Sequence, residues 1–350
     1  MDYSMFLSSR AAPPPLPGFH TFLEGQDLID ANKLEATITT SPNGEVTVSH
    51  PSKNQTWHRG QRVGRGGQAT IFFERSVPSP AAPSALVRVI KKQVTANGEA
   101  TTTPDDIRNE LAILLYFTHS SRPDLFTCAQ GWFMEGPHHV IAMKLLQGDL
   151  EDHIRETKAP FSEPDTRIIA RQVLDALAFM HARGFTHRDV KLNNIMVAAK
   201  PRPDAPFIRW SVRLGDFGLS QYHDDSTLPP EGRISGDGTA NYKAPELFYI
   251  VDPDEPTLLR FEAKADMYAL GVTIFRMLTG EAPYEVAVGD EDPQVVKKFS
   301  RDGPPEEPFD KACVSRKGRG FVRVLTMIDP SARPTAATAL HMSDWLKGTE

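Results

Sequence analysis

The stretch that decides the fold is "HRDVKLNN", His187 to Asn194, taken together with "DFG", Asp216 to Gly218. It provides an aspartate that can accept a proton, Asp189, followed by Lys191 and Asn194, and Asp216 adds a second carboxylate. Carboxylate and amide oxygens are ligands that Mg²⁺ prefers, and a positioned carboxylate can take a proton from a reacting hydroxyl. The pattern therefore predicts a site for phosphoryl transfer.

The composition bounds what this site can belong to. With 350 residues, of which 40% are hydrophobic and 24% are charged, the chain is long enough for one large or two ordinary globular domains. The net charge of -6 disfavours a nucleic-acid-binding surface as the main function, because such domains tend to be strongly basic. Cys128 and Cys313 lie far apart, which excludes a disulfide framework and favours an intracellular compartment, cytoplasmic or nuclear.

The N-terminal part of the chain changes character near residue 34. Residues 1–33 include "AAPPPLPG" and are expected to form a flexible proline-rich tail, which a regulatory partner could bind. Residues 34–56 contain two alternating runs around "SPNG", which predicts a β-hairpin extension. No run of about 18 apolar residues and no secretory signal is found, so no membrane partner is expected.

A β-rich segment and one helix come next. "VGRGGQATIFFE", Val63 to Glu74, predicts a glycine-rich turn between two strands, in which small residues let backbone amides approach phosphate oxygens. "LVRVIKKQV" predicts a basic strand, and "DDIRNELAILLYFTH" an amphipathic helix that contains Glu110.

From about residue 148 the chain is mainly helical. Ser162 and Asp165 form an N-cap signature before "TRIIARQVLDALAFMHARG", and "AKADMYALGVTIFRMLTG" is apolar almost all round, as a buried central helix would be. Between the two lies "GTANYKAPE", Gly238 to Glu246.

The order of these signals resembles that of the eukaryotic protein kinase domain, over residues 57–346. The resemblance implies an α+β fold with two lobes. A small β-rich N-lobe with one main helix is expected at about residues 57–143, and a larger, mainly helical C-lobe at about 148–346. Lys191 and Thr239 match the serine/threonine branch, and "GDL" and "HMSDWL" look most like the calcium/calmodulin-dependent and checkpoint-type groups.

The resemblance also implies roles for single residues. ATP and Mg²⁺ are the expected cofactors, and a protein with a Ser or Thr acceptor is the expected substrate. Asp189 takes the role of catalytic base, Lys191 neutralises phosphate charge, and Asn194 and Asp216 hold the metal. The residues expected to bind the nucleotide are Val63, Gly64, Gly66, Ala69 in place of a usual third glycine, Ile71, Arg88, Glu110, and the gatekeeper and hinge Met143, Lys144 and Leu145.

Outside the catalytic roles, the resemblance marks residues of the activation loop and the scaffold. Ser235 is the first choice for a phosphorylated residue, whereas Thr239 is expected to contact the catalytic Asp and Lys. Glu246 and Arg333 are expected to form a structural ion pair, and Asp266 to hold the backbone of the catalytic loop.

The strand lysine that pairs with the helix Glu has two candidates. One alignment places Arg88 there, which keeps the charge but replaces a compact ammonium with a planar fork. The other places Lys91 there, 19 residues before Glu110. Because positions 88 and 91 differ by an odd number, they cannot share one face of a regular strand. We favour Arg88.

Two functional hypotheses follow. The first is an active serine/threonine protein kinase. The second is a weak or inactive pseudokinase that acts as a nucleotide-binding scaffold, because Arg88 replaces the usual lysine. Asp189, Asn194 and Asp216 are all present, which favours activity.

Overall fold

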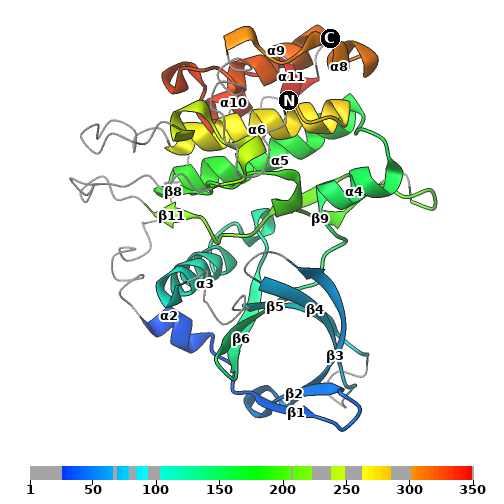
Figure 1. Ribbon diagram of the computed structural model, residues 1–350, viewed down its shortest axis with the longest axis vertical. Helices are drawn as coiled ribbons and strands as arrows, with labels where there is room; N and C mark the ends of the chain where they lie inside the picture. The colour runs from blue at the N-terminus through cyan, green and yellow to red at the C-terminus, as the bar shows by residue number, and fades with distance from the viewer. Residues whose placement is uncertain are drawn as a thin grey trace, which may run out of the picture. The chain divides into compact units, whose positions relative to one another are not determined.

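The computed structural model describes residues 26–65, 69–78, 84–93, 103–205, 208–222, 238–248, 262–284 and 301–348. The chain forms two compact units. The first comprises residues 1–119 and 128–145, and the second comprises residues 120–127 and 146–350. The first is β-rich with one long helix and the second is mainly helical (Figure 1), so the expected α+β fold with two lobes is confirmed.

The first unit is built on one antiparallel seven-stranded sheet with the order β1-β2-β3-β4-β5-β7-β6. The alternating runs of the sequence supply the strands, and Gly44, with φ of 82°, turns the chain between the first two. Their bounds are β1 Thr37–Thr40, β2 Val46–His50, β3 Gln55–Arg65, β4 Ala69–Ser76, β5 Val87–Gln93, β6 Ala129–Glu135 and β7 His138–Lys144.

The two edges of this sheet are brought together by the residues just before β1. Lys33 forms a parallel bridge to Trp132 on β6, and the backbone nitrogen of Leu34 donates to the carbonyl oxygen of Trp132 at 2.7 Å. The sheet therefore curls into a nearly closed barrel (Figure 1). Its core includes residues from both ends of the sheet, namely Leu34, Val48, Trp57, Ile90, Phe133, Val140 and Ala142.

The barrel corrects one expectation about the N-terminus. Residues 1–33 were expected to be a flexible tail, but Gln26–Ala31 forms helix α2, in which Ile29 is buried. The indole nitrogen of Trp132 donates to the carbonyl oxygen of Ile29 at 2.7 Å, which ties this helix to β6. The prolines at positions 13–15 lie outside the described residues.

Helix α3, Pro104–Thr118, is the long helix of the first unit. Thr103 and Asp106 form a reciprocal capping box and Pro104 occupies the first turn, so the local sequence starts the helix here. At its other end the side chain of His119 is hydrogen-bonded to that of Asn32, 3.1 Å away, just after α2. The N-terminal segment thus contacts the helix that carries Glu110.

The second unit consists mainly of helices around α6, Glu262–Thr279. Most described residues of α6 are buried, as its all-round apolar sequence predicts, and α6 packs between α5 and α9 (Figure 1). The other helices and short strands are α4 Leu150–Thr157, α5 Glu163–His181, α8 Glu306–Lys311, α9 Arg316–Leu325, α10 Ala336–Met342, α11 Asp344–Lys347, β8 Phe185–Thr186, β9 Ile195–Ala199, β10 Ser211–Leu214 and β11 Gln221–Tyr222.

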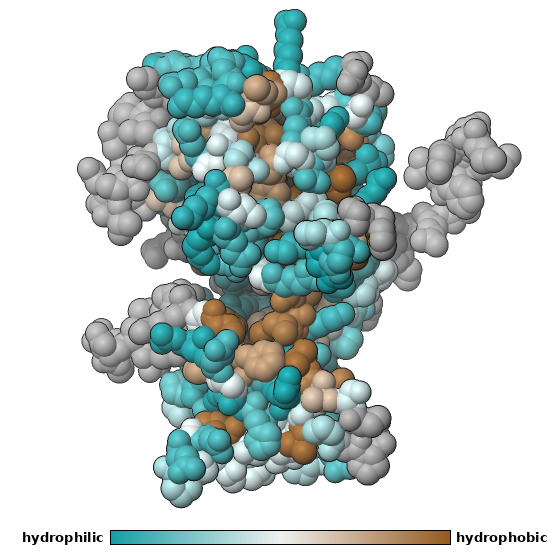
Figure 2. All heavy atoms as spheres, turned by 90° about the vertical axis from the view of Figure 1, so that its right-hand side faces the viewer, coloured by the Kyte–Doolittle hydropathy of each residue, from teal (hydrophilic) through white to brown (hydrophobic). Residues whose placement is uncertain are grey.

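Among the described residues, few large hydrophobic side chains are exposed. Hydrophilic residues make up most of the face shown in Figure 2. Within the part of the chain that the structure describes, no helix has the length and apolar character needed to span a bilayer.

Candidate functional site

In the first unit, Lys91 on β5 and Glu110 on α3 form an ion pair. The Nζ atom of Lys91 lies 2.5 Å from Oε1 of Glu110, and the two side chains are only 16% and 7% exposed. Such a pair, largely removed from water, holds an ammonium group at a fixed position. The structure therefore brings Lys91, and not Arg88, to the helix glutamate.

The expectation that Arg88 pairs with the helix glutamate is wrong. Arg88 is 1% exposed and points into the barrel, where its guanidinium bonds to Glu74 on β4 at 2.7 Å and lies 4.0 Å from the ring centroid of Trp57. Strand alternation does separate positions 88 and 91, but it places Lys91 on the face toward α3. Glu74 lies directly opposite Arg88 in the sheet register. An acidic residue on the neighbouring strand was the feature of the sequence that could have indicated the pair of Arg88 with Glu74.

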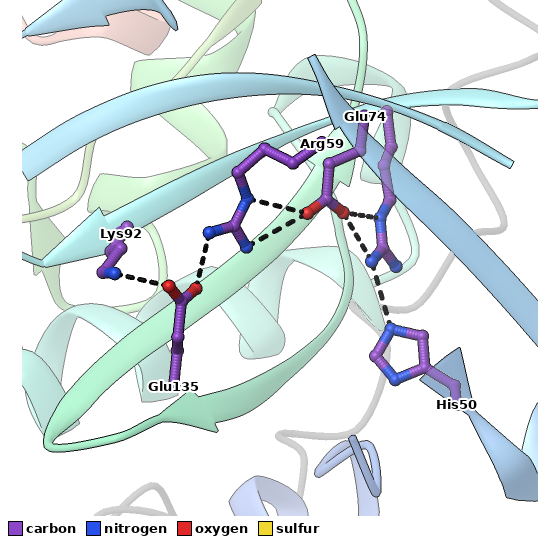
Figure 3. A network of polar contacts seen from close by, with 6 residues as sticks. His50, Arg59, Glu74, Lys92 and Glu135 are labelled. Atoms are coloured by element: carbon purple, nitrogen blue, oxygen red, sulfur yellow. Dashed lines mark hydrogen bonds and ion pairs between the residues drawn. The ribbon is translucent and has the colours of Figure 1, made fainter. Parts of the chain in front are cut away.

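Through its contacts with Glu74 and His50, Arg88 belongs to a larger polar network inside the barrel, of which Figure 3 labels the other members. Glu74 also accepts from Arg59 at 3.2 Å, and Arg59 continues to Glu135 at 2.7 Å. Burial disfavours the charge of Glu135, but the hydrogen bonds from Lys92 and Arg59 hold its pKa below the ordinary value. These charges are paired with one another within the sheet.

The glycine-rich segment contributes to two paired strands, β3 and β4, as its sequence predicts, and residues 66–68 between them lie outside the described residues. Gly64 on β3 pairs with Ile71 on β4, Val63 is 50% exposed, and Ala69 is buried at the start of β4 opposite Gln93. Gly66 lies outside the described residues.

The residues expected to form the hinge lie where the first unit ends. Met143 and Lys144 are the last two residues of β7, and Leu145 ends the unit. On β5, Val89 is opposite Met143. Because Val89 and Lys91 are two residues apart, they lie on one face of the strand.

In the second unit, Asp189 is the centre of a dense set of hydrogen bonds. One carboxylate oxygen, Oδ2, accepts from the amide of Asn194 at 2.9 Å and lies 2.7 Å from Nζ of Lys191. The other, Oδ1, accepts from the hydroxyl of Thr239 at 2.8 Å. The carboxylate is therefore fixed in orientation and surrounded by donors, as a group that receives a proton at one defined position needs to be.

The orientation of Asn194 suits a metal ligand. Its Nδ2 donates both to the carbonyl oxygen of Asp189, at 2.8 Å, and to the Asp189 carboxylate, so the amide cannot be flipped. Its Oδ1 accepts no hydrogen bond from the described residues and remains available as an oxygen ligand. Asp216 is exposed, with φ of 61°, a left-handed conformation that Asp tolerates better than most residues. These two oxygen donors fit Mg²⁺.

Thr239 links the catalytic loop to the segment "GTANYKAPE". Its Oγ1 accepts from Nζ of Lys191 at 2.7 Å while donating to Asp189, so the expected contact with the catalytic Asp and Lys is confirmed. Ser235, expected to be phosphorylated, lies outside the described residues.

Asp266, at the start of α6, forms hydrogen bonds with the backbone of the loop that carries Asp189, as expected. Its carboxylate accepts from the backbone nitrogens of His187 at 2.9 Å and Arg188 at 2.7 Å, and His181 on α5 bonds to it at 2.8 Å. Burial opposes the ionisation of Asp266, but His181 and His187 hold its pKa below the ordinary value. The sequence interpretation missed His181, although its place at the last residue of α5, just before the loop, was visible.

The ion pair of Glu246 and Arg333 is also confirmed. Arg333 is 1% exposed and makes a bidentate contact with Glu246 at 2.6 and 2.8 Å. Its other donors bond to backbone carbonyl oxygens, including that of Lys264 at 3.1 Å. The pair therefore fixes the end of "GTANYKAPE" against the start of α6 and is scaffold.

Comparison with known proteins agrees, over most of the chain, with the family resemblance drawn from the sequence. A model of the protein kinase domain matches residues 57–346. The chain is 28% identical over 292 residues to the serine/threonine-protein kinase RAD53 of Saccharomyces cerevisiae, which covers 81% of this chain and 32% of that protein. It is 28% identical over 248 residues to calcium/calmodulin-dependent serine/threonine-protein kinase 1 of Oryza sativa subsp. japonica, covering 70% of this chain and 37% of that protein.

The chain thus spans about a third of the length of these two relatives. A mitogen-activated protein kinase kinase kinase 3 of Arabidopsis thaliana is 26% identical, over 83% of this chain and 46% of that protein, so similarity extends across several serine/threonine kinase groups. Among solved structures, Rad53 1-466 in complex with AMP-PNP matches with a TM-score of 0.59 and 24% identity, over 82% of this chain and 64% of that one. This likeness concerns the fold alone.

Proposed function

The chain belongs to the protein kinase domain family, and on that premise we propose that it is a serine/threonine protein kinase. It transfers the γ-phosphate of ATP to Ser or Thr hydroxyls of a protein substrate. The observation that carries the proposal is the cluster around Asp189, whose carboxylate is held by Asn194, Lys191 and Thr239 at 2.7–2.9 Å. Such a cluster has the parts that phosphoryl transfer to a hydroxyl requires.

Each group of the cluster has a role in the reaction. Asp189 orients the attacking hydroxyl and accepts its proton, and Lys191 supplies positive charge to the transferred phosphoryl group. Asn194 and Asp216 hold Mg²⁺, which when bound neutralises charge on the phosphates. Thr239 keeps the Asp189 carboxylate and the Lys191 ammonium in one geometry.

In the first unit, Lys91 takes the role that the sequence interpretation gave to Arg88. Its ammonium is held by Glu110 and binds the α- and β-phosphates of ATP. Gly64, near the end of β3, has no side chain that would keep the backbone amides of this segment from the phosphates. The last residues of β7 and Leu145 contact the adenine through their backbone.

The experiment is a phosphotransfer assay with purified protein, labelled ATP, Mg²⁺ and a mixture of protein substrates. We expect incorporation on Ser and Thr, abolished by EDTA and reduced at least ~10²-fold in the matched variant Asp189→Asn, which keeps the size of the side chain but cannot take the proton. Equal incorporation by the wild type and Asp189→Asn, with both folded, would contradict the proposed activity.

A nucleotide-binding pseudokinase is the second candidate. Its main argument was the replacement of the strand lysine by Arg88, and the pair of Lys91 with Glu110 at 2.5 Å removes that argument. A thermal shift caused by Mg²⁺ and ATP, without phosphate transfer to any protein or to the chain itself, would favour it over the kinase.

A further inference from the structure

A second polar residue of β5 contacts the helix glutamate. Gln93 is 6% exposed, and its Nε2 donates to Oε2 of Glu110 at 3.1 Å. Lys91 occupies the other carboxylate oxygen, Oε1. Because residues 91 and 93 are two apart on the strand, they point to the same face, and both donors reach the one carboxylate from α3.

The contact leaves one polar atom of Gln93 buried and unpaired, which indicates that a glutamine is kept here for a function. Since Nε2 must face a carboxylate, Oε1 of Gln93 points away, and it is buried without a hydrogen-bond partner among the described residues. A buried unpaired amide oxygen is unfavourable, and an apolar side chain would avoid it. On β4, the residue opposite Gln93 is Ala69, which contributes no polar group.

We propose that Gln93 is a positioning residue of the kinase reaction, which holds the Glu110 carboxylate so that Lys91 is presented to the nucleotide phosphates. This rests on the proposed function. A carboxylate held by one donor can rotate about its last bond, whereas one held at both oxygens by a single strand cannot. Gln93 thereby couples α3 to β5 at the residue pair on which nucleotide binding depends.

The first test replaces Gln93 with leucine, which has a similar volume and cannot donate. We expect KM for ATP to rise about tenfold, the loss of one hydrogen bond to a charged group, with kcat and KM for the protein substrate nearly unchanged. A variant that is simply less well folded lowers kcat through its active fraction and leaves KM for ATP as it was. Gln130→Leu, the same change at an exposed position of β6, is the control.

The second test is Gln93→Glu, which places a carboxyl at the same distance from Glu110. An ionised Glu cannot donate, but a protonated one can, so kcat/KM for ATP relative to wild type should recover as the pH falls. The charged groups that the structure shows at this point are Lys91 on β5 and Glu110 on α3. A ratio that stays flat or falls with acidification would overturn the proposal, as would an unchanged KM for ATP in Gln93→Leu.

A third measurement does not need turnover. In urea denaturation, the double-mutant cycle of Gln93→Leu and Glu110→Leu should show coupling, because each substitution removes one partner of the same hydrogen bond. Additive changes would refute the contact. If the wild type binds ATP but transfers no phosphate, the kinase proposal fails, while ATP affinity in Gln93→Leu and this cycle still decide the role of Gln93.

Discussion

Arg88 and Lys91 are both cations of β5, yet their removal should have opposite consequences. In Arg88→Met the buried Glu74, which is fully shielded from solvent, loses its partner at 2.7 Å, and the stacking on Trp57 is lost. Breaking a buried pair from one side costs about 3–5 kcal/mol. Because Arg59 still bonds to Glu74 at 3.2 Å, we expect the lower end, about 3 kcal/mol.

For a unit of this size, that loss lowers the melting temperature by about 6–12 °C. Folded Arg88→Met should bind ATP with nearly the affinity of the wild type, because the side chain points into the barrel and away from Glu110. Lys91→Met should do the reverse. It should cost about 1 kcal/mol of stability, since Glu110 retains Gln93, and it should weaken ATP binding about 10- to 100-fold.

The assays are urea denaturation for stability and calorimetric titration with ATP for affinity, both on folded protein. The double variant Arg88→Met with Glu74→Gln should lose less stability than the sum of the two single changes, since Glu74→Gln removes the charge that Arg88→Met leaves unpaired. A stable Arg88→Met protein with impaired ATP binding, beside a Lys91→Met protein that binds normally, would refute this assignment and return the phosphate contact to Arg88.

Two further predictions concern the barrel, and one concerns the metal. His50 is neutral in the fold, because its Nδ1 donates to the carbonyl oxygen of Glu35 and its Nε2 accepts from Arg88. Burial lowers the pKa of His50 from its ordinary value of 6.5, and the hydrogen bond to Glu35 opposes this shift. Stability should therefore be complete above about pH 6.5 and fall as the pH drops toward the folded-state pKa, a slope that His50→Gln should reduce in denaturation curves. A chain that starts at residue 57 lacks the core residues Leu34 and Val48. It should be insoluble, or have a far lower melting temperature than a chain that starts at residue 26. Equal melting temperatures would exclude a structural role for residues 34–56. With Asn194→Leu, Mg²⁺ should no longer raise ATP affinity, whereas Gln172→Leu on α5 should leave the Mg²⁺ effect intact.

The catalytic loop was predictable because its geometry is local. Asp189, Lys191 and Asn194 lie within six residues of sequence, and their spacing alone sets which groups can meet the same carboxylate. The distant partners Asp266 and Arg333 were found only through the resemblance to the kinase family, since nothing in their own surroundings specifies a contact with residues that are far away in the chain.

The closure of the barrel could not be predicted. It depends on backbone hydrogen bonds that join Trp132 to Asn32 and Leu34. These residues are about a hundred positions apart in the chain, and backbone hydrogen bonds have no side-chain signature. Helix α2 was missed for a related reason, because a six-residue helix has little stability of its own and exists here through its contact with β6. The hairpin of residues 34–56 could be predicted from the sequence, but the surface on which it packs could not.

The choice between Arg88 and Lys91 failed because β5 carries polar residues on both faces. A strand with one apolar face reveals its orientation by alternation, but here Arg88 and Lys92 point into the barrel while Lys91 and Gln93 point to α3. The interior can hold charged groups because β4 and β6 supply Glu74 and Glu135 as partners at 2.7 and 2.5 Å.

The two faces of β5 are linked through the register of the strand. A one-residue slip of the strand would bury the ammonium that meets Glu110 and move Arg88 away from Glu74, so one register satisfies both the barrel and the nucleotide-binding pair. The pair of Glu74 with Arg88 places charged groups in the interior of the barrel, but it also selects that register. In the slipped register Glu74 would be buried without Arg88 as a partner, which is unfavourable. The network inside the barrel thereby fixes which side of β5 faces α3.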